Sequence, residues 1–230
     1  MKISISGLEL EEGKVKYDDD VFTGLVEKFQ PSKQAPYYFE LMQEDFQAAD
    51  VIAITSDKIL DLLILDIEKL ENRLSRTDNA DEIAILEKCI KVLETEKPVC
   101  DLEISETEKN ILTTLNPLSF RPTIVLDSPT VNVNELCNLV LEKSGMMFFY
   151  TAGKKEVHAW LVEKGSDAIT CAGRIHTDLA RGFIKAELVS FDNLMKSHSF
   201  QDAHSKGLTK LVDRDFPVPE KTILEIRFNV

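Results

Sequence analysis

The chain has 230 residues, of which 43% are hydrophobic and 29% are charged, an ordinary composition for a folded globular protein. This length suffices for one large or two modest domains, each able to bury its own core. No segment approaches the roughly 18 to 20 apolar residues of a membrane span, and the first apolar stretch is too short for a signal peptide, so we expect a cytoplasmic protein without a membrane partner.

The net charge of −13 is distributed unevenly along the chain. Residues 148–230 contain 12 Lys and Arg against 11 Asp and Glu, a net +1, and the 147 residues before them contain 15 against 29, a net −14. Because the acidic part repels polyphosphate backbones, any contact with RNA or a ribosome is expected through the C-terminal part. The alternative is that the C-terminal part is simply less acidic.

Two strands are predicted before the first helix. The alternating run Lys2–Ser6 reads as a short strand that ends at Gly7, and the apolar run Val51–Ile54 is typical of a buried parallel strand. Asp57 is in position to cap a helix that follows this second strand.

A helical hairpin is predicted next. Apolar residues recur at three- and four-residue spacing in two stripes, separated by a polar corner at residues 77–81: Ile59, Leu63, Ile67, Leu70, Leu74 and then Ile83, Leu86, Ile90, Leu93. Two such stripes joined by a short turn indicate an antiparallel coiled-coil hairpin. A capping box at Ser105–Glu108 opens a further helix, and residues 122–126 return the chain to a strand.

The C-terminal part reads as a β-hairpin followed by a helix and another strand. Residues 148–152 and 157–162 carry the β-branched and aromatic side chains typical of strands, and Gly153, Lys154 and Lys155 turn the chain between them. A helix is expected over residues 167–177.

The run AGRIHTDLARGFIKAELVSF, residues 172–191, resembles the signature of the C-terminal TGS domain of the YchF/Obg-like ATPases, and the ending at residues 226–230 is similar too. The resemblance implies an α+β protein: a C-terminal ubiquitin-like β-grasp (TGS) domain over residues 147–230 and a truncated α/β nucleotide-binding-like domain over residues 1–56 and 122–146. It also implies an inserted helical coiled-coil hairpin over residues 57–121.

The phosphate loop of that family is degraded in this sequence. A working loop reads G-x-x-x-x-G-K-[ST], because its backbone N–H groups face the phosphates, its Lys reaches them and its hydroxyl holds Mg²⁺. Here five residues separate Gly7 from Gly13, Val15 follows Lys14 in place of the hydroxyl, and three glutamates lie in the loop. We interpret Gly7, Gly13 and Lys14 as a vestigial loop, and an ordinary strand and turn as its structure.

Two further nucleotide motifs are also missing or displaced. The region that resembles the magnesium motif, residues 35–44, lacks its Asp and Gly. Residues 132–135 spell the N-x-x-E of the base-recognition motif, but a helix N-cap is the favoured interpretation of Asn132. Without these parts phosphoryl transfer loses its positioning and charge stabilisation, so we expect no catalytic residues and no cofactor.

The sequence contains no recognisable metal or disulfide framework. Its four cysteines are scattered without a C-x-x-C pair, and His198 and His204 are six residues apart, which matches no known metal spacing. We expect no metal site and reduced thiols.

Six residues are candidates for contacts with a partner. They surround the hairpin turn and the corner between helix and strand: Lys154, Lys155, Arg174, His176, Arg181 and Lys185. For His176, with the adjacent Thr177 and Asp178, a capping or structural role is favoured over catalysis. A basic patch here is a candidate surface for phosphate or RNA, with an ordinary solvated surface as the alternative.

Three functions are consistent with these observations. The favoured one is a non-enzymatic module whose C-terminal domain binds a ribosome, RNA, a translation factor or a nucleotide regulator. The second is a hydrolase that uses ATP or GTP through an altered loop, and the third is an adaptor whose coiled coil recruits a protein partner. The sequence does not define the oligomeric state.

Overall fold

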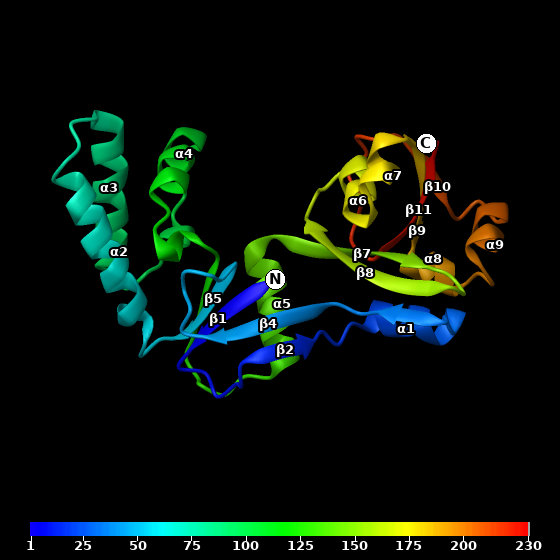
Figure 1. Ribbon diagram of the computed structural model, residues 1–230, viewed down its shortest axis with the longest axis horizontal. Coiled ribbons are helices and arrows are strands. Elements are labelled where there is room, and N and C mark those ends of the chain that lie inside the picture. The colour runs from blue at the N-terminus through cyan, green and yellow to red at the C-terminus, as the bar shows by residue number, and fades with distance from the viewer. Residues whose placement is uncertain (230) are drawn as a thin grey trace. The chain divides into compact units, whose positions relative to one another are not determined.

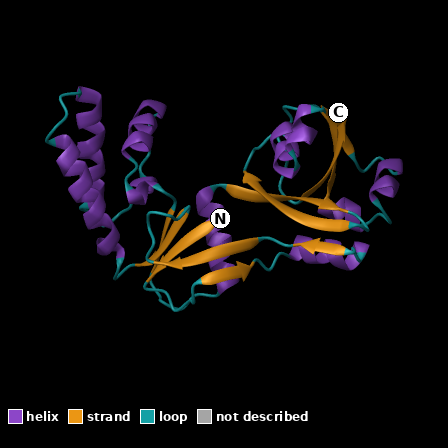
Figure 2. Ribbon diagram, viewed as in Figure 1, coloured by secondary structure: helices purple, strands orange, loops and turns teal. Residues whose placement is uncertain are grey.

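The computed structural model describes residues 1–229, so Val230 at the end of the predicted C-terminal signature lies outside the described residues. The chain forms a mixed α/β structure with two sheets (Figures 1 and 2). It divides into two compact units, each made of two segments. Unit 1 contains Met1–Val15 and Tyr38–Ser144, and unit 2 contains Lys16–Tyr37 and Gly145–Val230.

The largest difference between these units and the predicted domains concerns one segment. Residues 16–37 were expected in the nucleotide-binding-like domain, but they belong to unit 2. The reason is packing, because helix α1 (Asp20–Phe29) contacts strands β7 (Met146–Ala152) and β8 (Glu156–Glu163) of unit 2. The region predicted as a helical insertion, residues 57–121, lies within unit 1.

The sheet of unit 1 has five strands in the order β2-β4-β1-β5-β6. The strands are β1 (Lys2–Ser6), β2 (Gly13–Lys16), β4 (Tyr38–Gln43), β5 (Val51–Thr55) and β6 (Thr123–Leu126). Strand β1 is parallel to β4 and to β5, and β5 is parallel to β6. Every residue of β5 is buried, which confirms the interpretation of Val51–Ile54 as a buried parallel strand.

The helices of unit 1 follow β5 and β6. They are α2 (Ile59–Leu74), α3 (Ala80–Leu93), α4 (Glu106–Leu115) and α5 (Val133–Ser144), with short 3₁₀ turns η1 (Val99–Asp101) and η2 (Leu118–Phe120). The capping box at Ser105 and Glu108 is confirmed. The prediction of a cap at Asp57 is wrong: α2 has Lys58 at its N-cap, without a side-chain cap, because Lys58 N–H closes a turn on the Thr55 carbonyl.

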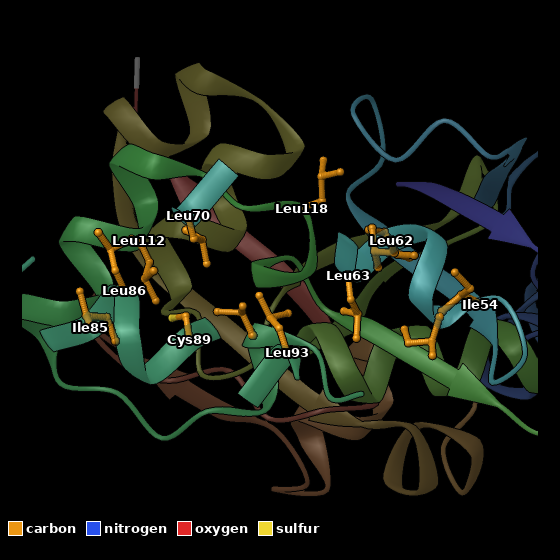
Figure 3. Close-up of a cluster of buried hydrophobic side chains, with 13 residues drawn as sticks. Ile54, Leu62, Leu63, Leu70, Ile85, Leu86, Cys89, Leu93, Leu112 and Leu118 are labelled. Atoms are coloured by element: carbon orange, nitrogen blue, oxygen red, sulfur yellow. The ribbon is translucent and has the colours of Figure 1, made fainter. Parts of the chain in front are cut away.

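Helices α2, α3 and α4 share one apolar core (Figure 3). Both predicted stripes contribute to it, and so do the neighbouring positions Leu62, Ile85 and Cys89, which are fully buried. Those extra positions are buried because the pair α2 and α3 also packs against Leu112 of α4 and Ile54 of β5. The hairpin therefore buries more than its own seam, and its packing extends to the sheet of unit 1.

Asp66 ties α2 to the segment that returns to the sheet. Its carboxylate is fully buried and accepts hydrogen bonds from Leu118 N at 2.6 Å, Ser119 N at 2.7 Å and Ser119 Oγ at 2.6 Å. A buried carboxylate is tolerated when its oxygens are satisfied in this way. Asp66 thus sets the position of η2 against α2.

The sheet of unit 2 has six strands in the order β10-β9-β11-β7-β8-β3. Besides β7 and β8 they are β3 (Lys33–Ala35), β9 (Phe183–Ser190), β10 (Lys210–Val212) and β11 (Thr222–Phe228). The predicted hairpin is confirmed by antiparallel pairing of β7 with β8. Strand β3 pairs in parallel with β8, so residues 33–35 extend this sheet.

The helices of unit 2 are short. In addition to α1 they are α6 (Ala168–Ile175), α7 (Thr177–Arg181), α8 (Phe191–Met195) and α9 (Phe200–Ser205). Helix α6 buries Ala168 and Cys171 in one core, together with Phe149 of β7 and Leu188 of β9. No helix among residues 1–229 is both long and apolar enough to cross a membrane.

Helix α1 is anchored to unit 2 by a buried polar pair. The Asp19 carboxylate caps α1 by accepting from Val21 N and Phe22 N, and it also accepts from the Tyr150 hydroxyl at 2.7 Å. Burial raises the pKa of Asp19, although these hydrogen bonds oppose the shift, and burial beside Asp19 raises the pKa of Tyr150. The helix start and the sheet are thus fixed to one another.

Candidate functional site

The carboxyl edge of the unit 1 sheet is where a nucleotide would bind in an open α/β fold. Strand β1 ends there at Ser6, and the next residue, Gly7, has a backbone φ of +75°. A Cβ atom on Gly7 would lie 2.0 Å from Thr55 Oγ1, at the end of the neighbouring strand β5. Gly7 is therefore required for the close approach of two strand ends, a role that involves no phosphate.

The loop after Gly7 is bound to the opposite loop of the same edge. Glu9 N donates to the Pro129 carbonyl at 2.8 Å, and Thr130 Oγ1 donates to the Glu9 carboxylate at 2.8 Å. Leu8, between Gly7 and Glu9 in the chain, is buried, with 8% of its surface exposed. An anion at this edge would meet the Glu9 carboxylate and would have to displace these contacts.

Gly13 and Lys14, the other members of the predicted vestigial loop, lie in strand β2. The element that follows β1 is thus a strand, whereas a phosphate loop leads into a helix whose N-terminal N–H groups bind the phosphates. Lys14 is exposed on β2. The geometry does not bring Gly7, Gly13 and Lys14 together as a phosphate cradle.

Asn132 caps helix α5. Its side-chain oxygen accepts hydrogen bonds from Asn134 N at 2.8 Å and from Glu135 N at 3.3 Å. This confirms the predicted capping role of Asn132. In this geometry the amide oxygen of Asn132 is occupied by the helix start.

A hollow of about 450 Å³ lies elsewhere in unit 1, beside η1 and α4. Its two lysines are paired, Lys143 with Asp101 and Lys109 with Glu106 at 3.8 Å. Burial raises the pKa of Cys100, which also lines the hollow, so its thiol stays protonated. This hollow offers neither a free cation nor a reactive nucleophile from those three side chains.

The predicted basic residues of unit 2 separate into two groups. Arg181 pairs with Asp178 at 2.8 Å, and Lys185 pairs with Asp213. His176 accepts from Asp178 N at 3.1 Å and caps α7, so its predicted capping role is confirmed. Within the described residues these three side chains therefore already serve local structure.

Lys154, Lys155 and Arg174 form the second group. All three are exposed, and none of their side chains has an ion-pair partner among the described residues. Lys154 and Lys155 are placed at the tip of the β7–β8 hairpin by backbone hydrogen bonds from Ser32 N and Lys33 N to their carbonyl oxygens. The segment that holds this turn thus comes from residues 16–37.

A groove of about 570 Å³ lies beside the two hairpin lysines. One wall is the hairpin tip, residues 151–156, and the opposite wall is the second half of β11. Ile175 and Leu179, from α6 and α7, complete the lining. We define these residues as the β7–β11 groove, and it is the hollow in unit 2 that contains predicted site residues.

The groove contains a carboxylate as well as lysines. Glu156 lies in the hairpin wall and is bound to Lys33 at 2.8 Å, and this contact lowers its pKa. Glu225 belongs to β11 and pairs with Glu187 on β9, so its side chain lies on the face of the sheet opposite to Leu224 and Ile226, where partial burial and the nearby Glu187 raise its pKa. The unpaired lysines of the groove are therefore confined to the hairpin tip, and the groove does not resemble the continuous basic surface that binds nucleic acid.

A charged cluster around Glu187 was not anticipated from the sequence. Glu187 is 4% exposed on β9 and binds Thr209 Oγ1 at 2.7 Å, Arg227 at 2.5 Å and His204. Burial by itself would raise the pKa of Glu187, but these three hydrogen bonds outweigh it and lower the pKa. The cluster connects residues far apart in sequence, so no local motif indicates it.

The other unpredicted feature is α1, which did leave a signal in the sequence. Asp19 is a favourable N-cap residue, and the apolar positions Val21, Phe22 and Leu25 that follow it lie on one helical face. These signals predict the helix but not the strands against which it packs, because no feature of residues 16–37 indicates contact with the strands around residue 150.

Comparison with known proteins agrees with the resemblance noted in the sequence. Residues 146–229 match the family model YchF-GTPase_C, described as a protein of unknown function (DUF933). Two similar curated proteins carry the name Ribosome-binding ATPase YchF. The one from Bacillus subtilis is 25% identical over 237 residues, covering 74% of this chain and 65% of the relative. The one from Mycoplasma genitalium is 37% identical over 98 residues, covering 43% of this chain and 27% of the relative. The chain thus spans less than two thirds of the length of these relatives.

The fold agrees as well. The solved structure of the Schizosaccharomyces pombe YchF GTPase matches with a TM-score of 0.82, covering 99% of this chain and 97% of that one, at 18% sequence identity. This likeness concerns the fold alone. The C-terminal part of the chain thus matches the YchF C-terminal family model, and the chain is similar to YchF proteins in sequence and in fold.

Proposed function

We propose that this chain is a non-enzymatic, ribosome-associated binding protein of the cytoplasm that acts through unit 2. The proposal rests on the contrast between the carboxyl edge of the unit 1 sheet and the sequence match in unit 2. The carboxyl edge of unit 1 has the Glu9 carboxylate and the strand β2 where a phosphate loop would stand. In unit 2, residues 146–229 match the family model, which is almost all of the C-terminal segment of that unit. The relatives named above are ribosome-binding, which supports a ribosome as the partner.

The proposal includes a TGS-like β-grasp fold for residues 147–230. Its support is the strand order β10-β9-β11-β7-β8, in which the last strand lies between the first hairpin and β9. Strand β11 is parallel to β7, and α6 packs on the resulting sheet. Under this proposal, α1 and β3 are additions to the grasp from the N-terminal part of the chain.

Co-sedimentation with ribosomes tests the partner. The full chain should pellet with ribosomes at about 50 mM salt and much less at about 200 mM, because contacts with phosphates weaken as salt rises. Arg174→Glu, at an exposed unpaired arginine, should reduce the bound fraction at low salt, and Lys196→Glu at the C-cap of α8 is a control with the same charge change. Absence of pelleting at both salt concentrations would refute ribosome association.

The second candidate function is hydrolysis of ATP or GTP by an altered loop, which the names of the relatives favour. Calorimetry of the full chain with each nucleotide in Mg²⁺ distinguishes it. We expect no measurable heat, because a phosphate would meet Glu9 without a helix N-terminus to offset the repulsion. Micromolar affinity that disappears in Lys14→Ala would instead establish a nucleotide site.

The third candidate is an adaptor that recruits a protein through the α2–α3 hairpin, proposed from the sequence as a coiled coil. One observation favours it: Leu60, Ile64 and Leu65 of α2 are between 46% and 49% exposed. Exposed apolar residues one helical turn apart are typical of a docking surface. A protein complex that is pulled down with the wild-type chain but not with the Ile64→Lys variant would support this function, provided that the far-UV circular dichroism spectrum of the variant is unchanged.

A further inference from the structure

The β7–β11 groove has an apolar floor. Leu224 and Ile226 of β11, together with Ile175 of α6, belong to the core that packs under α6, and the groove gives access to the edge of that core. Phe228 continues the same wall and is 46% exposed. An occupant with apolar side chains would bury this surface and gain the corresponding hydrophobic free energy.

The two walls of the groove are strand edges. Strands β7 and β11 are parallel and pair at Tyr150 and Ile223. Beyond this point β7 pairs with β8 and β11 pairs with β9, each on the side away from the groove. Backbone N–H and C=O groups at strand edges bind extended chains, which is how peptides add to sheets.

The charges at the groove favour a carboxylate over a phosphate chain. Lys154 and Lys155 are exposed and unpaired among the described residues, so they can receive an anion at the hairpin tip. The β11 wall presents apolar side chains on this face of the sheet, so a polyanion that ran the length of the groove would place its charges against apolar surface. A peptide that carries its negative charge at one end avoids that unfavourable contact.

We propose that the β7–β11 groove binds an extended peptide segment that has apolar side chains at alternate positions and an acidic end. The apolar side chains contact Ile226 and Phe228, the acidic end contacts Lys154 and Lys155, and the peptide backbone pairs with the strand edges. The proposal goes beyond association with ribosomes and does not depend on it.

Selection from a displayed library of random octapeptides with free carboxyl termini tests the proposal on the full chain. The most enriched peptide, labelled with fluorescein, serves as the probe in a polarisation titration. We expect Lys154→Glu/Lys155→Glu to weaken its binding at least about tenfold, because the pair of attractions becomes a pair of repulsions. Lys196→Glu/Lys221→Glu makes the same change in net charge outside the groove and should alter binding less than about twofold.

A second measurement locates the probe. Amide resonances of residues 151–155 and 224–228 should shift when the unlabelled peptide is titrated into the ¹⁵N-labelled chain, and Phe228→Ser should weaken binding while the far-UV spectrum is retained. The proposal is overturned if no enriched peptide depends on Lys154 and Lys155, or if the shifts fall elsewhere. It is also overturned if a uridine 20-mer binds through the two lysines and peptides do not. Loss of ribosome pelleting alone would leave it standing.

Discussion

The two units of this protein differ most in charge. Unit 1 has 12 Lys and Arg against 25 Asp and Glu, and unit 2 has 15 against 15, so the entire net charge of −13 lies in unit 1. Counting charges on either side of residue 148 gives nearly the same difference. That count, however, places the 22 residues of the segment 16–37 with the acidic part instead of with unit 2. The acidic unit contains the predicted vestigial loop, and the neutral unit contains residues 146–229, which match the family model.

The units also differ in how their buried polar groups are used. In unit 1, Asp66 joins α2 to η2 across about 50 residues of sequence. In unit 2, Asp19 joins α1 to β7 across 131 residues. Both carboxylates hold a segment against the core of its own unit, so each offers a way to disturb one unit selectively. The single tryptophan, Trp160 on β8, reports on unit 2.

The largest expected effect is in unit 1. Asp66→Ala leaves three buried donors without an acceptor and should lower the free energy of unfolding by about 3 to 5 kcal/mol. Urea unfolding followed by circular dichroism should show the loss, and the transition followed by Trp160 fluorescence should move much less. The exposed Asp61→Ala in the same helix is the control. Equal shifts in both signals would mean that the units unfold together.

A smaller effect is expected in unit 2. Asp19→Ala removes the cap of α1 and the partner of the Tyr150 hydroxyl, and should cost about 2 to 3 kcal/mol. Because α1 packs on β7 and β8, the loss should appear in the Trp160 transition. Asp20→Ala changes the adjacent, exposed carboxylate and is the matched control. An unchanged Trp160 transition would contradict the assignment of residues 16–37 to unit 2.

Two carboxylates of unit 2 should respond to pH in opposite directions. Because the pKa of Asp19 is raised in the folded state, ionisation of Asp19 lowers the free energy of unfolding. This loss is absent below the pKa of Asp19 in the unfolded state and complete above its pKa in the folded state. Because the pKa of Glu187 is lowered in the folded state, its ionised carboxylate contributes to the free energy of unfolding above the pKa of the unfolded state. That contribution is lost as the pH falls through the pKa of the folded state. From about pH 6 to about pH 3, Asp19→Asn should therefore lose stability relative to wild type and Glu187→Gln should gain it. Urea unfolding at a series of pH values measures both, and parallel trends would contradict the assigned shifts.

The smallest expected effect concerns the groove. Lys154→Glu/Lys155→Glu should change the free energy of unfolding by less than about 0.5 kcal/mol, because both side chains are exposed and unpaired. Thermal unfolding followed by Trp160 fluorescence checks this, with Lys196→Glu/Lys221→Glu beside it. A larger loss would give the two lysines a structural role and weaken their assignment to a ligand.

Features that depend on neighbouring residues were predictable from the amino-acid sequence. The capping box at Ser105, the cap at Asn132, the buried strand β5 and the β7–β8 hairpin were all predicted from residues close to one another in the chain. Caps and turns have such signals because their hydrogen bonds close within a few residues. The predicted cap at Asp57 was wrong because a backbone hydrogen bond between Lys58 N and the Thr55 carbonyl starts α2 without a side-chain cap.

Features that depend on residues far apart in the chain were apparent only from the fold. It assigned α1 and β3 to unit 2, paired Lys185 with Asp213, and left Lys154 and Lys155 beside the β7–β11 groove. The predicted basic patch was thereby reduced to its unpaired members, because whether a charge is neutralised depends on partners that the fold brings to it. Strand pairing and burial are set by contacts across the whole chain, and no local spacing of residues encodes them.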